Sequence, residues 1–277
     1  MEFEASWARN GDVELYVESM GDPALPTLVL VNGLGSQCIN FADDWCRMFA
    51  AEGFRVVRFD NRDVGLSSKL EGIDYTLADM ADDAVAVLDA VGVDRAHVMG
   101  CSMGGMIAQR LAIDHTDRLL SMTSVMSRPG EPGSGESSPA ALEFLLSPPA
   151  PSRSAYIDRQ VAALHVYGSK PEWLDDEAIR ARAARAYDRC FCPEGVARQM
   201  RAVAHDGSRA EQLRELAVPT LVIHGSRDTL IDPSGGRRTA ELVPGARYVE
   251  IEGMGHDYPP PVWAQWVGVW SDFVHSR

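Results

Sequence analysis

The sequence predicts an α/β fold with a mostly parallel central sheet flanked by helices and a helical insertion. Three observations lead to this fold class: short β-rich runs alternate with helical patterns through the first 126 residues, the alternation then stops, and it resumes at Val218. Parallel strands need a crossover connection, and a helix between two strands supplies it. With 277 residues, 45% of them hydrophobic, the chain can bury a large core.

Five strands are expected in the first half of the chain. The run TLVLVNG is apolar at every position from Leu28 to Val31, which is typical of a strand buried on both faces. The other runs are rich in β-formers and end at turn residues. The expected strands are Val13–Gly21, Thr27–Gly33, Phe54–Asp60, Arg95–Gly100 and Leu119–Met126.

Three helices are expected between these strands. The segment Thr76–Val93 begins at a threonine that can cap a helix, and its apolar residues recur on one face. The segment Phe41–Gly53 has apolar residues at helical spacing and stops at a glycine, and Met103–His115 follows the fourth strand.

The alternation stops after Met126. Residues 128–151 are crowded with Pro, Gly and Ser and indicate a loop, and three helical patterns follow without a strand between them. We therefore expect a core of residues 1–126 and 206–277 and a helical cap, or lid, of residues 127–205. The later elements are expected at Val218–Gly225, Ser234–Val243, Ala246–Gly253 and Pro260–Arg277.

The segment GCSMGG, Gly100 to Gly105, carries the most informative motif. It contains G-x-S-x-G around Ser102, directly after an expected strand and directly before an expected helix. In that context the motif is typical of a nucleophile elbow, a tight turn that exposes a serine oxygen above the sheet. The motif therefore predicts that Ser102 is a catalytic nucleophile rather than a helix cap.

A serine nucleophile needs a base, and the base needs an acid that orients it; in this architecture they follow the serine in the order acid, then histidine. Among seven histidines, His256 is favoured because its loop, EGMGHDYPP, follows the last expected strand and can reach the elbow. His224 lies within a strand end and is interpreted as a buried structural histidine. For the acid, the segment HGSRDTLIDP offers Asp228 and Asp232, and Asp228 is favoured because it is closer to the strand end.

The loop in LVLVNGLGSQ, with Gly33 and Gly35, has two interpretations. A glycine pair after a strand also begins a dinucleotide-binding turn. That turn requires a third glycine where this chain has Cys38, so no nucleotide cofactor is expected.

The order of these motifs resembles that of the α/β-hydrolase family: the glycine loop, RFDNRDVGLSS, GCSMGG, the helical insertion, VIHGSRDTLIDP and EGMGH. The chain is more particularly similar to the aclacinomycin methylesterase group in the segments RxDxRDxGxS, AVLDxxGVDRAHVxGxSMG and PTLVI. The resemblance implies a Ser-His-Asp triad, which maps onto Ser102, His256 and Asp228, with no cofactor.

The resemblance also implies an oxyanion hole made by the backbone N–H groups of Leu34 and Met103. Family members usually carry His-Gly in the first glycine loop, where this chain has Asn32 and Gly33. We expect these two residues to support the loop, because an asparagine side chain can donate and accept hydrogen bonds there. Many members also carry glycine where this chain has Asp63, a residue type that tolerates left-handed turns.

The expected function is that of a serine hydrolase that cleaves a carboxylic ester through an acyl-enzyme. The substrate would be a small to medium, partly apolar molecule, and the resemblance suggests a methyl ester of a polyketide-like compound. The alternatives are a cofactor-free haloperoxidase or perhydrolase, a lactonase or C–C bond hydrolase on the same triad, and a non-catalytic ligand-binding protein. Residues that could line the pocket, or merely pack the insertion, are Met126, Phe144, Tyr156, Tyr167, Trp173, Tyr187 and Phe191.

The composition of the chain limits the kinds of molecule it is expected to bind. The net charge of −14 and the pI near 4.9 argue against nonspecific binding to nucleic acid or anionic membranes, because a negative field repels phosphates. Five cysteines are too few and odd in number for a disulfide scaffold, and the Cys190-x-Cys192 pair has no second ligand pair for a metal. The chain shows neither a signal peptide nor a membrane span, so a cytoplasmic location is expected. Nothing indicates an oligomer, since Trp263, Trp266 and Trp270 form a helix face expected to pack on the core.

Overall fold

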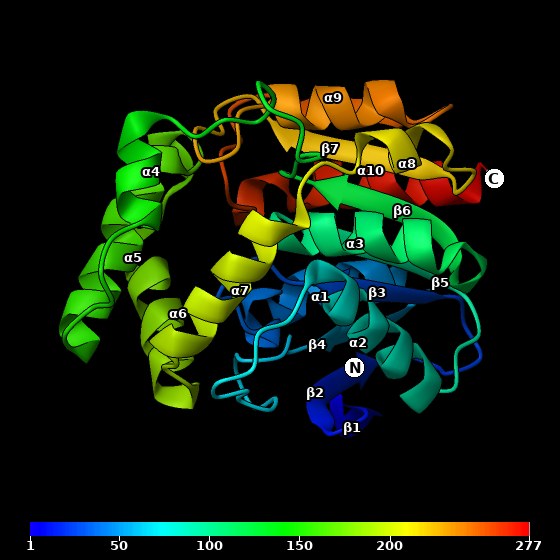
Figure 1. Cartoon of the computed structure of the whole chain (residues 1–277), viewed down its shortest axis with the longest axis horizontal. Helices are drawn as coiled ribbons and strands as arrows, with labels where there is room; N and C mark the ends of the chain where they lie inside the picture. Colours follow the sequence, from blue (N-terminus) through cyan, green and yellow to red (C-terminus); the bar gives the residue numbers. More distant parts are fainter. Residues whose placement is uncertain (277) are drawn as a thin grey trace.

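Eight strands form one sheet in the computed structural model, which describes residues 1–276. The order across the sheet is β1-β2-β4-β3-β5-β6-β7-β8, and the sheet runs through the body of the molecule in Figure 1. Arg277, at which the last expected helix ends, lies outside the described residues. The strands are β1 (Glu4–Asn10), β2 (Val13–Met20), β3 (Thr27–Val31), β4 (Arg55–Phe59), β5 (Ala96–Cys101), β6 (Leu119–Val125), β7 (Thr220–Gly225) and β8 (Arg247–Ile251).

The sheet is mostly parallel, as predicted. Strands β4, β3, β5, β6, β7 and β8 run in one direction, and β2 pairs with β4 in the antiparallel sense. The carboxyl ends of the parallel strands therefore meet at one edge of the sheet, where ligand and catalytic sites of such folds are found. The loops after β3, β5, β7 and β8 carry the four segments in which site residues are predicted.

The strand β1 was not predicted. It pairs with β2 over its full length, from Glu4 opposite Ser19 to Asn10 opposite Val13. The connection is a two-residue turn in which Gly11 has φ +57°. An Asn-Gly pair before a β-rich run is a hairpin signal, so the sequence did contain the information.

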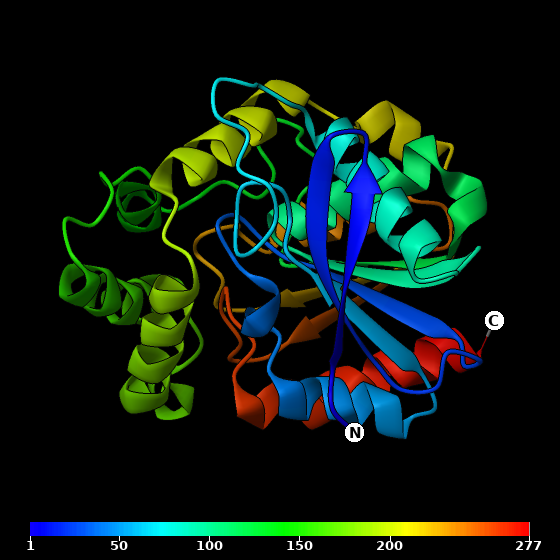
Figure 2. The ribbon, with the colours of Figure 1, turned by 90° about the horizontal axis from the view of Figure 1, so that it is seen from below.

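Helices cover both faces of the sheet, as Figure 2 shows. On one face lie α1 (Asp43–Ala51) and α10 (Trp263–His275), and on the other α2 (Leu77–Ala90), α3 (Met103–Asp114), α8 (Ala210–Arg214) and α9 (Ser234–Leu242). Helix α2 begins with a complete capping box between Thr76 and Asp79, which satisfies two of the N–H groups at its start. The expected start at Thr76 is thus confirmed.

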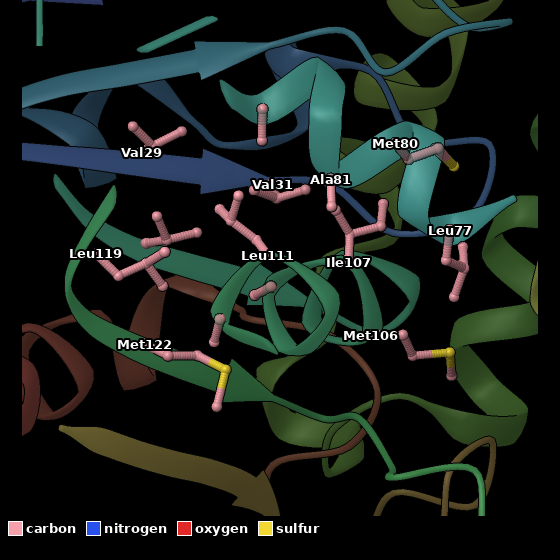
Figure 3. Packing of buried hydrophobic residues seen from close by; sticks show 14 of the residues in the cluster. Val29, Val31, Leu77, Met80, Ala81, Met106, Ile107, Leu111, Leu119 and Met122 are labelled. Atoms are coloured by element: carbon pink, nitrogen blue, oxygen red, sulfur yellow. The ribbon is translucent and has the colours of Figure 1, made fainter. Parts of the chain in front are cut away.

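Each face has its own hydrophobic core. Figure 3 shows Val29 and Val31 of β3 beside Ile107 and Leu111 of α3, and all four side chains are buried. On the opposite face, Trp266 and Trp270 are fully buried and Trp263 is partly buried, so the prediction that this face packs on the core is confirmed. These two cores hold the edge that carries the catalytic loops.

Residues 126–219, between β6 and β7, contain helices and no strand; we call this segment the insertion. Its helices are α4 (Pro139–Leu145), α5 (Arg153–Tyr167), α6 (Asp176–Arg189), α7 (Pro193–Asp206) and α8. Helix α4 lies where a loop was expected, because Ser138 caps it and Pro139 occupies its first turn, where proline is tolerated. Figure 1 shows α4, α5 and α6 beyond the sheet edge, with α7 leading back to the body.

Among the described residues, four short 3-10 helices complete the fold: η1 (Cys38–Asn40), η2 (Thr116–Arg118), η3 (Pro171–Trp173) and η4 (Pro260–Val262). Within residues 1–276, no helix combines the length and the apolar character needed to cross a membrane.

Candidate active site

Ser102 occupies the turn between β5 and α3. Its backbone has φ +58° and ψ −121°, a conformation that costs a non-glycine residue about 1–3 kcal/mol. The turn is held by a hydrogen bond from the Ser102 N–H to the Val125 carbonyl at 2.9 Å, and by the Ser127 hydroxyl, which donates to the Ser102 carbonyl at 2.8 Å. The fold therefore maintains a strained serine at the carboxyl end of a central strand.

The glycines around Ser102 are required by close backbone contacts. A Cβ atom on Gly100 would lie 1.9 Å from the Gly104 carbonyl oxygen, and one on Gly104 would lie 2.1 Å from the Val31 carbonyl oxygen. A Cβ atom on Gly33 would lie 3.1 Å from the Ser102 Cβ. The glycine loop after β3 thus packs directly against the serine turn.

His256 and Asp228 meet on the loops after β8 and β7. The His256 Nδ1 lies 2.7 Å from Asp228 Oδ2, and the Asp228 side chain is completely buried. Burial alone would raise the pKa of Asp228, but the two neighbouring histidines lower it further than burial raises it. A carboxylate only accepts, so Nδ1 of His256 carries the proton and Nε2 carries the lone pair of a base.

The other Asp228 oxygen is also fully engaged. Oδ1 accepts the N–H groups of Leu230 and Ile231, each at 2.9 Å. These bonds hold the carboxylate plane and favour the ionised form.

The two alternatives considered for base and acid have other contacts. His224 is fully buried, and its Nε2 lies 2.8 Å from the Ile231 carbonyl oxygen and 3.3 Å from Asp228 Oδ2. Because a carbonyl only accepts, Nε2 carries a proton, and His224 faces the acid as a hydrogen-bond donor. Asp232 is exposed, and its carboxylate accepts the Ser234 N–H at the start of α9.

Backbone N–H groups near the serine come from the start of α3 and from the loop after β3. Met103 is the first residue of α3, and N–H groups in a first turn have no partner within the helix. Within residues 1–276, the Leu34 N–H donates to no other backbone carbonyl. The next N–H, that of Gly35, donates to Gln199 Oε1 at 2.9 Å.

Gln199 was missed by the sequence reasoning. It lies in α7 of the insertion, is fully buried, and donates from Nε2 to the Arg62 carbonyl at 2.8 Å. Its carboxamide therefore joins the glycine loop to the turn after β4. No local pattern marks it, because its partners Gly35 and Arg62 are far away in the sequence.

Asn32 is buried, and its role differs from the one expected. Its carbonyl oxygen accepts Asn61 Nδ2 at 3.1 Å, but within residues 1–276 neither polar atom of its side chain has a hydrogen-bond partner. The bonds that hold this loop come instead from Asn61 and Gln199. Gly33 contributes by the close approach to Ser102 described above.

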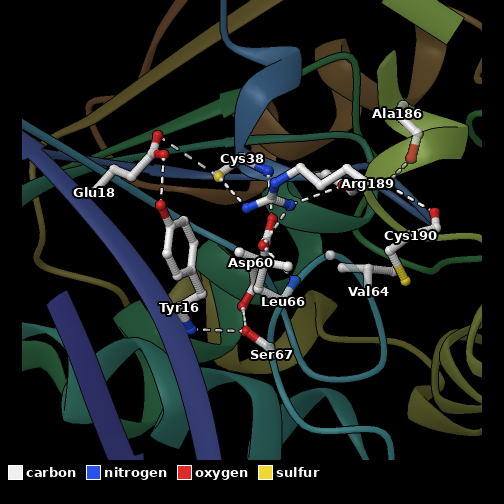
Figure 4. A network of polar contacts seen from close by, with 12 residues as sticks. Tyr16, Glu18, Cys38, Asp60, Val64, Leu66, Ser67, Ala186, Arg189 and Cys190 are labelled. Carbon is white, nitrogen blue, oxygen red and sulfur yellow. Dashed lines mark hydrogen bonds and ion pairs between the residues drawn. The ribbon is translucent and has the colours of Figure 1, made fainter. Parts of the chain in front are cut away.

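Two buried ion pairs tie the insertion to the core loops. Asp63, with φ +73°, accepts Arg198 Nε and Nη2 at 2.8 and 2.7 Å and also the Tyr75 hydroxyl at 2.7 Å. In Figure 4, Arg189 of α6 contacts Asp60, with 2.7 Å between Nη1 and Oδ2. Burial alone would raise the pKa of Asp63, but the hydrogen bonds from Arg198, the Leu70 N–H and Tyr75 lower it overall.

The aromatic residues of the insertion divide into groups. Tyr167 meets His256 edge-on, with ring centroids 6.1 Å apart. Tyr156, Tyr187 and Phe191 pack on one another, with Tyr187 and Phe191 stacked at 4.6 Å. The remaining residues considered for the pocket are Met126, which is buried with φ +42°, Trp173, which carries Lys170 over its ring, and the half-buried Phe144.

Comparison with known proteins finds similarity over nearly the whole chain. A family described as alpha/beta hydrolase fold matches residues 26–258. The rhodomycin D methylesterase DauP of Streptomyces sp. (strain C5) is 32% identical over 270 residues, and the match covers 90% of each chain. The rhodomycin D methylesterase DnrP of Streptomyces peucetius is 31% identical over 272 residues, and the match covers 90% of this chain and 91% of that one. The crystal structure of the enol-lactonase from Burkholderia xenovorans LB400 superposes with a TM-score of 0.79 at 26% identity, covering 98% of this chain and 100% of that one.

Proposed function

Because this chain belongs to the alpha/beta hydrolase fold family, we propose that it is a serine esterase in which Ser102, His256 and Asp228 form the catalytic triad. The observation that carries the proposal is the combination of a strained serine after β5 with a buried His256–Asp228 pair on neighbouring loops. The similarity to two methylesterases supports an ester as the bond that is cleaved. The oxyanion hole is proposed at the N–H groups of Leu34 and Met103.

In the proposed mechanism, Nε2 of His256 removes the proton from the Ser102 hydroxyl as Oγ attacks the carbonyl carbon of the ester. Asp228 stabilises the imidazolium that forms without taking its proton. The oxygen of the tetrahedral intermediate accepts the two N–H groups of the oxyanion hole, and groups of this kind each contribute about 2.7–4 kcal/mol where they can be deleted.

The intermediate collapses as the bond between the carbonyl carbon and the alcohol oxygen breaks. His256 returns its proton to the leaving alcohol, and the acyl group stays on Ser102. A water molecule then attacks the acyl-enzyme while His256 again acts as base, which releases the carboxylic acid and restores the serine.

We propose a methyl ester of a partly apolar molecule as the substrate class. The names of the two Streptomyces relatives support the methyl ester, and the ring of Tyr167 beside His256 supports an apolar acyl group. A lactone is the second candidate, because a lactone is a cyclic ester and the enol-lactonase structure matches over 98% of this chain.

The test compares wild type and Ser102→Ala on p-nitrophenyl esters, on aromatic and aliphatic methyl esters, and on a set of lactones. We expect turnover of methyl esters by wild type and loss of turnover in the variant. Retained turnover in Ser102→Ala would exclude the triad, and lactones hydrolysed with a much higher kcat/KM than open esters would favour the second candidate.

A further inference from the structure

The loop that carries His256 is held by the insertion as well as by the core. The His256 N–H donates to the Tyr167 carbonyl at 2.7 Å, and the Lys170 N–H donates to the Gly253 carbonyl at 2.8 Å. The junction after α5 therefore lies along the histidine loop and exchanges backbone hydrogen bonds with it.

The two segments approach so closely that there is no room for a side chain at Gly255. A Cβ atom on Gly255 would lie 2.1 Å from both the carbonyl carbon and the oxygen of Gly168. On the acid's side, the Thr229 hydroxyl donates to the Val166 carbonyl at 3.2 Å. Residues 166–170 thus contact the loops of both the proposed base and the proposed acid.

Within this junction, Ser169 contacts both neighbours of His256. Its hydroxyl oxygen accepts the Gly255 N–H at 3.0 Å and donates to Asp257 Oδ1 at 2.5 Å, and its own N–H donates to the same Asp257 oxygen at 2.8 Å. Ser169 is only 2% exposed, so water does not replace these bonds easily.

The bonds of Ser169 also reach the carboxylate of Asp257, the residue that follows His256. Burial raises the pKa of Asp257, although the bonds from Ser169 oppose that rise. Without the hydroxyl, the Asp257 carboxylate would lose one of its two donors from Ser169, and the Gly255 N–H would lose its acceptor. A buried polar group that loses its partner is costly, so the loop would be expected to rearrange.

We propose that Ser169 is a positioning residue for the catalytic histidine, through which the insertion sets the orientation of His256. This inference rests on the proposed function of His256 as the base. The bond to Asp228 holds one edge of the ring, and Ser169 holds the backbone on both sides of it. The base is then confined to the side-chain rotamer in which Nδ1 contacts Asp228.

The experiment compares wild type, Ser169→Ala and Ser121→Ala, with Asp257→Asn as a second variant of the same contact. Ser121 is a matched control, because it is a buried serine whose hydroxyl lies 2.8 Å from Nδ1 of another histidine, His97, away from the catalytic edge. Asp257→Asn keeps an oxygen that can accept from Ser169. We measure kcat and KM on a p-nitrophenyl ester, thermal unfolding, and the downfield proton NMR signal of the His256 Nδ1–H, which does not depend on turnover.

We expect Ser169→Ala to lower kcat by about 10- to 100-fold with KM within about twofold, because a misplacement of a catalytic group by about 1 Å can lower the rate by about 100-fold. The downfield signal should broaden or disappear in Ser169→Ala and persist in Ser121→Ala and Asp257→Asn. Wild-type kcat and an intact signal in Ser169→Ala would overturn the proposal, as would an equal loss of kcat in Ser121→Ala. If wild type cleaves no ester but the signal disappears only in Ser169→Ala, the positioning role stands and the proposed function fails.

Discussion

The substitution Asp228→Asn tests the proposed acid, and the surrounding contacts determine which way the new amide faces. Oδ1 of Asp228 accepts the N–H groups of Leu230 and Ile231, each at 2.9 Å. Only the amide oxygen of asparagine can accept these bonds, so the amide nitrogen must take the position of Oδ2. That position is 2.7 Å from Nδ1 of His256.

The amide nitrogen is a donor, so Nδ1 of His256 must become the acceptor and the proton must move to Nε2. Nε2 can then no longer remove the proton of Ser102. The same amide nitrogen also faces the Nε2–H of His224, which lies 3.3 Å from Oδ2 in the wild type, and two donors repel. The variant thus stabilises the tautomer of His256 that cannot act as a base, and the repulsion from His224 weakens the position of the new amide.

We expect kcat of Asp228→Asn to fall by about 10⁴-fold, the loss typical of this change in a serine triad, with a much smaller change in KM. The assay is steady-state hydrolysis of a p-nitrophenyl ester at neutral pH. Asp232→Asn is the matched control and should keep the wild-type kcat, since that carboxylate is exposed and accepts only near the start of α9. A kcat within tenfold of wild type in Asp228→Asn would refute the assignment of the acid.

Three further substitutions test the loops around the site. Gln199→Met removes the acceptor of the Gly35 N–H, so kcat should fall by about tenfold with KM nearly unchanged. An unaltered kcat in steady-state kinetics would show that Gln199 only packs against the loop. Arg198→Met leaves the buried Asp63 without its cation, and urea unfolding should show a loss of about 3 kcal/mol, whereas a loss under about 1 kcal/mol would contradict the buried pair. Because the pKa of Asp63 in the folded state lies below its ordinary value of about 4, this stability is present above pH 4 and lost as pH falls through the folded pKa, so the variant should show a weaker acid dependence. Asn32→Ala should keep kcat within about threefold, because its side chain bonds to nothing in residues 1–276, and a larger loss would assign that side chain a role in the loop.

The sequence predicted the elements whose signals are local. The apolar run before Asn32, the capping threonine at position 76 and the glycines around Ser102 each specify a conformation within a few residues, and each lies where it was expected. The parallel sheet then brings loops together that are more than a hundred residues apart in the chain. His256 and Asp228 could be chosen because both follow strands, and strand ends meet at one edge.

The residues that were missed have partners that the sequence does not reveal. Gln199 is an ordinary polar residue in a helical pattern and Ser169 one in the connection after α5, and only the folded chain shows that they contact Gly35 and Gly255. The expected role of the Asn32 side chain came from the residue type alone and finds no bond in the structure. Polar contacts between distant segments depend on tertiary packing, which overrides local propensity.

The contacts of the insertion limit how it can open. Its anchors to the core include the ion pairs of Arg189 and Arg198 and the hydrogen bonds of Ser169 and Gln199. Lifting the insertion as one body would break these contacts and would disturb both the proposed base and the proposed oxyanion hole.

Helix α4 is different, since Ala141 is its only buried residue among Pro139–Leu145, and the neighbouring Leu146 is 61% exposed. Segments with few buried apolar contacts open at the lowest free energy. Movement that admits a substrate without disturbing the catalytic groups is therefore expected in α4 and its flanking loops, while α6 and α7 remain in place.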